Sequence, residues 1–136
     1  MGMTGAFNIN KKLHGDVYES VIDAKSSDYN TVASLTAYKC QGFTKLLVQY
    51  VISSTSWDRA GNIIVYGSFT ESGTYTAPDG TIENATFAVG TTDDSLEGAG
   101  EFYVVESIMP WIKIGWDNTT AGTTGTISVT VMPFNE

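Results

Sequence analysis

Two stretches of alternating apolar residues within residues 109–134 constrain the fold more than any other part of the chain. Successive side chains of a β-strand point to opposite faces, so each stretch predicts a strand with one apolar face. The predicted core positions are Ile112, Ile114 and Trp116 in the first strand and Ile127, Val129 and Val131 in the second. Residues 117–125 between them contain nothing that could anchor a core, so the chain must reverse there. This pattern predicts a long β-hairpin with a proline near each end, where the missing amide is tolerated.

Earlier parts of the chain predict further short strands, separated by turn residues about every ten positions. We expect these strands within residues 16–24, 31–38, 43–53, 63–69, 73–77, 81–89 and 102–108. The segment 43–53 is the most hydrophobic and is apolar on both faces, which is typical of a central strand. Turn residues then predict that it forms a second hairpin with 63–69. No segment has helical spacing of any useful length, so we expect an all-β fold: an antiparallel β-sandwich of about eight strands, a jelly roll or related Greek key.

Residues 1–15 differ from the rest because their few apolar residues are spread among Gly, Asn and Lys. We interpret them as an extended N-terminal arm, and residues 16–136 as a single β-sandwich domain. Two alternatives remain for the arm: a frayed terminus, or a strand added to a neighbouring subunit. In the second case the partner-binding residues would be Phe7, Ile9, Lys11, Lys12 and Leu13. We find no apolar run suited to a signal peptide or a membrane span, so we expect synthesis as a soluble cytoplasmic chain.

The net charge of −8 is concentrated in the second part of the chain. Residues 1–60 contain six basic and five acidic residues, whereas residues 61–136 contain one basic and ten acidic residues. An acidic surface repels phosphate backbones and anionic lipids, so nucleic-acid and membrane partners are disfavoured.

The sequence contains no pattern typical of an enzyme active site. No nucleophile elbow, phosphate-binding loop or zinc-protease motif is present, and His14 is the only histidine able to serve as a base. Cys40 is the only cysteine, which excludes an intrachain disulfide and indicates a buried, inert thiol. We therefore predict a protein that is not an enzyme and needs no cofactor.

Two groups of residues could bind a ligand. One is an acidic cluster that could hold Ca²⁺ and consists of Asp93, Asp94, Glu97 and Glu101. The spacing of these residues is not that of an EF-hand calcium loop, so a solvated loop is the favoured alternative. The other is a pair of aromatic residues, Trp57 in a loop and Trp111 on the face opposite to Trp116. An exposed indole can stack on a sugar or fill a subunit contact, so Trp57 and Trp111 are candidate glycan or subunit contacts.

Over about the last two-thirds of its length, the chain resembles small β-sandwich virion proteins of tailed bacteriophages. The resemblance is carried by a glycine-led hydrophobic strand, a loop ending in Gly-Asn, and a terminal strand pair with a Gly/Thr-rich tip: residues 42–51, 61–62, 63–69, 111–118 and 125–131. It rests on this pattern and on no catalytic signature.

The resemblance implies a non-enzymatic structural component of a virion. The expected function is that of a head decoration or cement protein that binds the capsid shell as an oligomer, with a homotrimer favoured. The implied partners are the major capsid protein or other virion proteins. The alternative that it leaves open is a carbohydrate-binding module of a tail fibre or baseplate.

Overall fold

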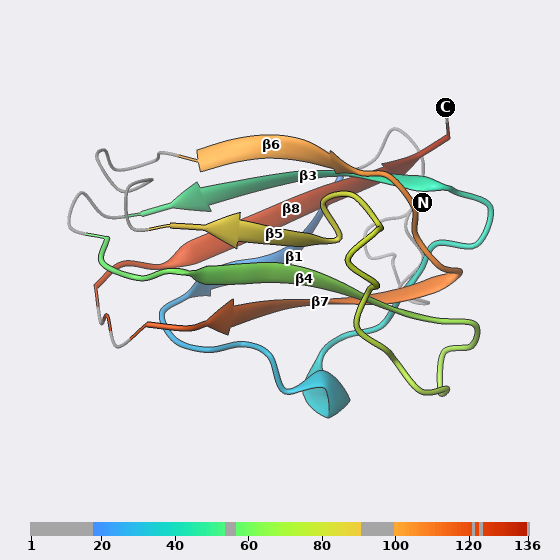
Figure 1. Cartoon of the computed structure of the whole chain (residues 1–136), viewed down its shortest axis with the longest axis horizontal. Coiled ribbons are helices and arrows are strands. Elements are labelled where there is room, and N and C mark those ends of the chain that lie inside the picture. The colour runs from blue at the N-terminus through green and yellow to red at the C-terminus, as the bar shows by residue number, and fades with distance from the viewer. Residues whose placement is uncertain (1–17, 54–56, 91–99, 121, 123, 136) are drawn as a thin grey trace, which may run out of the picture.

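The computed structural model describes residues 18–53, 57–90, 100–120, 122 and 124–135, and these residues form β-strands and a single short 3-10 turn (Figure 1). The strands are β1 (Glu19–Lys25), β2 (Tyr38–Lys39), β3 (Lys45–Ile52), β4 (Gly61–Ser68), β5 (Thr86–Val89), β6 (Gly100–Val105), β7 (Trp111–Asn118) and β8 (Ile127–Phe134). The 3-10 turn η1 comprises Val32–Ser34. The prediction of an all-β fold with about eight strands is confirmed.

The eight strands form two four-stranded antiparallel sheets that pack face to face. One sheet has the order β1-β8-β3-β6 and the other the order β2-β7-β4-β5. The first four strands therefore pair with the last four in reverse order, β1 with β8, β2 with β7, β3 with β6 and β4 with β5. These pairs alternate between the two sheets, as in a long hairpin that has been rolled up. This strand order is that of a jelly roll.

The core lies between the sheets, at the positions that the alternating pattern predicts. Ile112, Ile114 and Trp116 of β7 are buried, and so are Ile127, Val129 and Val131 of β8. The inward face of β3 is also fully buried and consists of Leu46, Val48, Tyr50 and Ile52. Strand periodicity therefore assigned the faces of these strands correctly.

The two predicted hairpins are wrong. β7 pairs with β4 and β2, whereas β8 pairs with β3 and β1, so the two strands lie in opposite sheets. The same is true of β3 and β4. Each connection crosses between the sheets, a distance of about 10 Å that a few residues can span. The apolar faces that a hairpin would place side by side face each other across the core instead.

The two crossings are bonded to each other at one end of the sandwich. Arg59, in the β3–β4 connection, is only 4% exposed. Its Nε and Nη1 donate hydrogen bonds to the carbonyls of Gly125 and Gly122, each at 3.0 Å. The Thr119 amide donates to the Ala60 carbonyl at 2.8 Å. A buried guanidinium with carbonyl acceptors thus joins the β3–β4 connection to the β7–β8 connection.

Three predicted strands are shorter than expected or absent. Residues 31–38 contain η1, and only Tyr38 belongs to a strand. Residues 73–77 contribute one isolated bridge, from Thr76 to Gly67, and only the last four residues of 81–89 form β5. Residues 31–37 do not form a strand because the chain here passes over the outer side of the β2-β7-β4-β5 sheet. The alternating pattern of these residues therefore does not reflect a strand.

Candidate functional site

The outward sides of the two sheets differ in how the rest of the chain covers them. Residues 26–37 cover the outer side of the β2-β7-β4-β5 sheet. Tyr66 Oη donates a hydrogen bond to Asn30 Oδ1 at 2.6 Å, and Lys113 Nζ donates to the Val32 carbonyl at 2.8 Å. A Cβ on Gly115 would lie 2.3 Å from Asn30 Oδ1, so this glycine lets the covering segment approach the sheet. Leu35 of the covering segment and Tyr66 of the sheet are both buried.

The outer side of the β1-β8-β3-β6 sheet has no such cover within the part of the chain that the structure describes. It contains a groove of about 480 Å³. Seven residues line it, and one of them, Val131, has its side chain in the core. We define the groove by the other six: Tyr18, Leu47, Gln49, Phe102, Thr130 and Met132. None of the six is Lys, Arg, Asp or Glu. The groove is therefore an uncharged surface on an acidic protein.

The strand register explains why these residues meet. Gln49 of β3 lies opposite Phe102 of β6 on one side and Thr130 of β8 on the other. Leu47 lies opposite Met132. Tyr18 immediately precedes β1, which is the neighbour of β8. Residues far apart in the sequence are thus brought to one surface by the jelly-roll order.

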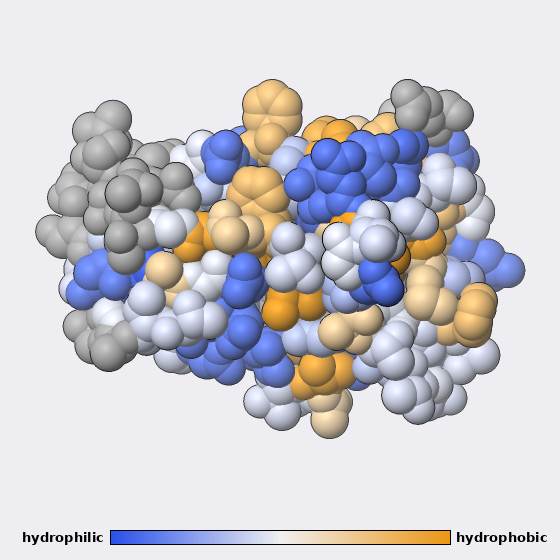
Figure 2. Space-filling view, in the orientation of Figure 1, coloured by the Kyte–Doolittle hydropathy of each residue, from blue (hydrophilic) through white to orange (hydrophobic). Residues whose placement is uncertain are grey.

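Two of the largest apolar side chains of the groove are among the most exposed of the molecule. Phe102 is 74% exposed and Tyr18 is 76% exposed. Val51, which follows on the same side of β3, is 36% exposed. In Figure 2, hydrophobic residues form several patches on the side seen in Figure 1, and some lie along its upper margin, over β6. A large exposed apolar patch is a feature of interaction surfaces.

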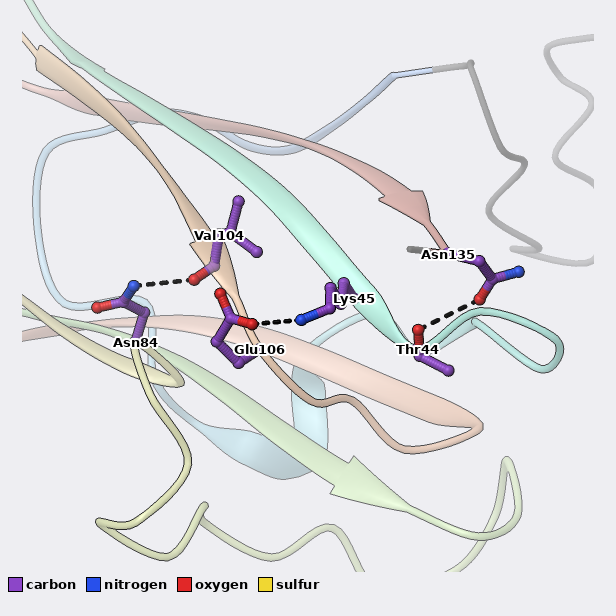
Figure 3. A network of polar contacts seen from close by, with 6 residues as sticks. All are labelled: Thr44, Lys45, Asn84, Val104, Glu106 and Asn135. Carbon is purple, nitrogen blue, oxygen red and sulfur yellow. Dashed lines mark hydrogen bonds and ion pairs between the residues drawn. The ribbon is translucent and has the colours of Figure 1, made fainter.

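A network of polar contacts closes one end of β6 (Figure 3). Lys45, at the start of β3, forms an ion pair with Glu106, which follows β6. Asn84 Nδ2 donates a hydrogen bond to the Val104 carbonyl at 2.8 Å, and the Glu106 amide donates to the Glu83 carbonyl at 3.3 Å. These contacts use backbone groups on the outer edge of β6. They block this part of the edge from pairing with another strand.

Neither the groove nor the one cysteine of the chain offers a reactive group. Cys40 is fully buried, as predicted, and burial raises the pKa of its thiol to about 12, so it is protonated at neutral pH. Within the described ranges, no group of three or more His, Cys, Asp or Glu side chains is arranged to hold a metal ion. The side chains of the groove can bury apolar surface and, through Gln49 and Thr130, form hydrogen bonds.

A second, smaller hollow of about 190 Å³ lies beside β4 and β7. Val65 and Ile112, which line it, belong to the core, and Ile82 and Ile108 pack against that core. This hollow is an extension of the interior, whereas the groove lies on the surface.

The structure places the predicted site residues in different surroundings. Trp57 is only 1% exposed and its ring packs against Trp116, so the prediction of an exposed Trp57 is wrong. The reason is that the β3–β4 connection folds inward, where a large indole fills the end of the core. Trp111 is half-buried on the outer side of β7.

Other predicted contacts lie outside the described residues. These are Phe7, Ile9, Lys11, Lys12 and Leu13, together with Asp93, Asp94 and Glu97 of the acidic cluster. Glu101 of that cluster is described, and it accepts a hydrogen bond from Tyr50 Oη at 3.1 Å.

Sequence reasoning missed Tyr18, Phe102 and Met132 as surface residues of one site. The one available signal was the second apolar face of residues 43–53, formed by Leu47 and Val51. That pattern was interpreted as the mark of a central strand, and β3 is indeed central in its sheet. No described element covers that second face, however, and this is what makes it a candidate contact surface.

Comparisons with known proteins add no family to this description. Neither protein-family models, nor curated proteins, nor solved structures give a match to this chain. Among the described residues, no helix has the length and apolar character needed to cross a membrane.

Proposed function

We propose that this protein is a non-enzymatic structural component of a tailed-phage virion, a head decoration or cement protein that binds the capsid shell as an oligomer. The observation that carries the proposal is the groove, an uncharged apolar surface on the side of the β1-β8-β3-β6 sheet that no described segment covers. The phage assignment itself comes from the sequence resemblance described above.

The contrast between the two sheets supports a contact role for the groove. The chain covers one outer side with residues 26–37 and keeps Leu35 and Tyr66 buried there. On the other side Phe102 and Tyr18 are about three-quarters exposed, at 74% and 76%. Transfer of apolar surface from water to a partner contributes about 25 cal/mol for each Å². Association through the groove would therefore gain free energy from burying these side chains.

The fold and charge are compatible with this role. Jelly rolls occur in viral capsid proteins as well as in lectins and cupins, so the fold alone does not choose among these functions. A net charge of −8 favours solubility before assembly. The glycan-binding alternative depended on two indoles, and the burial of Trp57 leaves only Trp111 as a candidate.

The direct test is to look for the chain in virions of the phage that encodes it. Particles purified through a density gradient would be analysed by mass spectrometry, and the position of the protein would be located by electron cryo-microscopy. We expect stoichiometric copies on the head. Absence of the chain from purified particles would contradict the proposal.

A matched pair of variants tests the groove itself. Phe102→Asp places a charge in the groove, whereas Phe69→Asp places one on a residue that is 79% exposed and directly follows β4 of the other sheet. Both variants should keep the circular dichroism spectrum of the parent protein. Only Phe102→Asp should reduce the number of copies per particle. Equal attachment by both variants would show that the groove is not needed for assembly on the shell.

A further inference from the structure

We infer that the groove of one copy receives residues 7–13 of a second copy, so that the oligomer is held together by exchanged arms. The inference rests on the proposed role of the groove as a contact surface, and it names the occupant. Four observations support it: the size of the face, the position of Tyr18, the direction in which the chain enters β1, and the charges of the two parts.

The outer side of the β1-β8-β3-β6 sheet, which no described segment covers, is smaller than a standard interface. The four strands are six to eight residues long. At about 4.8 Å between strands and about 3.4 Å per residue, they cover roughly 470 Å². A standard interface buries about 800 Å² on each partner. Face-to-face packing of two copies would therefore supply little more than half of the usual area. An extended segment lying in the groove would add apolar side chains and backbone area to the contact.

Residues 7–13 have the composition that the groove requires. Phe7, Ile9, Lys11 and Leu13 are spaced by even numbers, so in an extended segment three apolar side chains and one lysine would lie on one side. The groove offers uncharged walls to such side chains, and Gln49 and Thr130 offer hydrogen-bonding groups to the backbone between them. The segment is joined to the described chain at Tyr18, which itself lines the groove.

The ladder between β1 and β8 stops at the start of β1, beside Pro133. The Ser53 amide donates a hydrogen bond to the Thr126 carbonyl, so the backbone groups of Thr126 point toward β3. The direction alternates along a strand. Even-numbered residues of β8 therefore direct their backbone N–H and C=O groups to β3, and odd-numbered residues direct theirs to β1. Pro133 therefore faces the β1 side, where it has no amide hydrogen to continue the ladder beyond the Glu19–Val131 pair.

Chain direction then favours a neighbour over the same copy. A chain that kept the direction of β1 before Tyr18 would pass the Pro133 end of β8, whereas the groove extends the other way, toward Gln49 and Thr130. To enter its own groove, the chain would have to reverse within the four residues between Leu13 and Tyr18. A neighbouring copy can be reached without reversal, because residues 7–13 span about 23 Å when extended.

The charges of the two parts are complementary. Residues 1–17 contain Lys11, Lys12 and Asp16, which give this part a net charge of +1. Since the whole chain has a net charge of −8, residues 18–136 have a net charge of −9. Two such acidic bodies repel each other. A basic segment that passes from one body to the next offsets part of this repulsion. Each copy would give one segment and receive one, which produces a closed ring if the rotation between copies closes.

Disulfide trapping in the full-length chain tests the inference. All variants carry Cys40→Ala, so no natural thiol remains. One preparation carries Ile9→Cys and a second carries Gln49→Cys, and the two are mixed and oxidised gently. We expect a mixed dimer on a non-reducing gel, containing one chain of each kind, at a yield well above that of a control mixture in which Ser34→Cys replaces Gln49→Cys. Ser34 is exposed and lies in the segment that covers the other sheet.

Each outcome has a defined meaning. A mixed dimer specific to Gln49→Cys supports the exchange of arms. If the mixed dimer forms no better than the Ser34→Cys control, the inference is overturned. It is also overturned if the double variant Ile9→Cys/Gln49→Cys, when dilute, crosslinks only within one chain, because the arm then occupies its own groove.

Particle binding separates this inference from the proposed function. A chain that is found in purified virions but gives no specific mixed dimer overturns only the exchanged arm. A chain that forms the mixed dimer but is missing from virions overturns the virion role and leaves the exchanged arm in place.

Discussion

The rings of Trp57 and Trp116 lie 6.0 Å apart between centroids, with their planes tilted by 43°. Trp57 comes from the β3–β4 connection and Trp116 from β7, and both side chains are almost completely buried. Trp57 Nε1 also donates a hydrogen bond to the Gly90 carbonyl at 3.4 Å. The pair thus attaches a connection between the sheets to the β2-β7-β4-β5 sheet. This explains why an indole in a turn-forming sequence is not at the surface.

Replacement of Trp57 by Ala should destabilise the fold strongly. Truncation of a buried Trp removes its apolar contacts and leaves a cavity, which costs about 3–5 kcal/mol. The matched control is Trp111→Ala, because Trp111 is half-buried and should cost much less. Urea denaturation followed by circular dichroism gives both free energies of unfolding. Equal losses for the two variants would contradict the burial that distinguishes them.

A charge at position 114 should prevent folding, whereas one at position 113 should not. Ile114 is 3% exposed, and an unpaired carboxylate in its place costs several kcal/mol. Lys113→Asp removes a hydrogen bond to the Val32 carbonyl and a contact with the Tyr75 ring at 4.5 Å, which together cost about 1–2 kcal/mol. Soluble yield and thermal unfolding compare the two variants. A more severe effect of Lys113→Asp would mean that the register of β7 is displaced by one residue.

Arg59 should matter for stability because it bonds two connections together. Arg59→Met would leave the Gly122 and Gly125 carbonyls without this donor, at about 1–3 kcal/mol for each acceptor that stays buried. Arg59→Lys should recover only part of the loss, because an ammonium lacks the planar fork of the guanidinium. Thermal unfolding of the three proteins tests this order. If Lys restores full stability, charge rather than fork geometry is what the site requires.

Stability should fall in alkaline solution, in part because of Cys40. Burial raises the pKa of this thiol from 9.0 to about 12, so the folded state holds its proton where the unfolded state loses it. The contribution of this protonated thiol to the free energy of unfolding is therefore complete below about pH 9 and is lost as the pH rises toward about 12. Burial, with smaller contributions from Glu19 and Tyr29, also raises the pKa of Tyr38 to about 12, so Tyr38 acts in the same direction.

The Cys40→Ala variant isolates the part that belongs to the thiol. It should lose about 1 kcal/mol at pH 7 because a small buried side chain is truncated. Its free energy of unfolding should then decline less between pH 8 and pH 11 than that of the parent protein. Parallel declines in urea denaturation would show that the thiol does not contribute to the alkaline loss.

The groove shows how far sequence could lead toward the candidate site. Leu47 and Val51 were visible as a second apolar face on the most hydrophobic segment. Their companions Tyr18, Phe102 and Met132 come from three other parts of the chain, and nothing local marks them as a set. They meet because β6 and β8 flank β3, and β1 flanks β8. Only strand order, which depends on contacts across the whole chain, brings them to one surface.

The faces of the strands were determined by the sequence itself. Ile112, Ile114 and Trp116, like Ile127, Val129 and Val131, are buried as their spacing predicted. The reason is covalent: in an extended backbone, alternate side chains must point to opposite faces whatever the partner strand is.

The partners of those strands were decided only by the tertiary structure. A hairpin would put β7 and β8 about 4.8 Å apart in one sheet, and the observed crossing puts them in sheets about 10 Å apart. Both arrangements bury the same alternating residues, and the connection between the strands is long enough for either. The choice depends on β4 and β2 pairing with β7 and on β3 and β1 pairing with β8. Such long-range pairing is a property of the assembled sandwich and is not encoded in the local pattern of either strand.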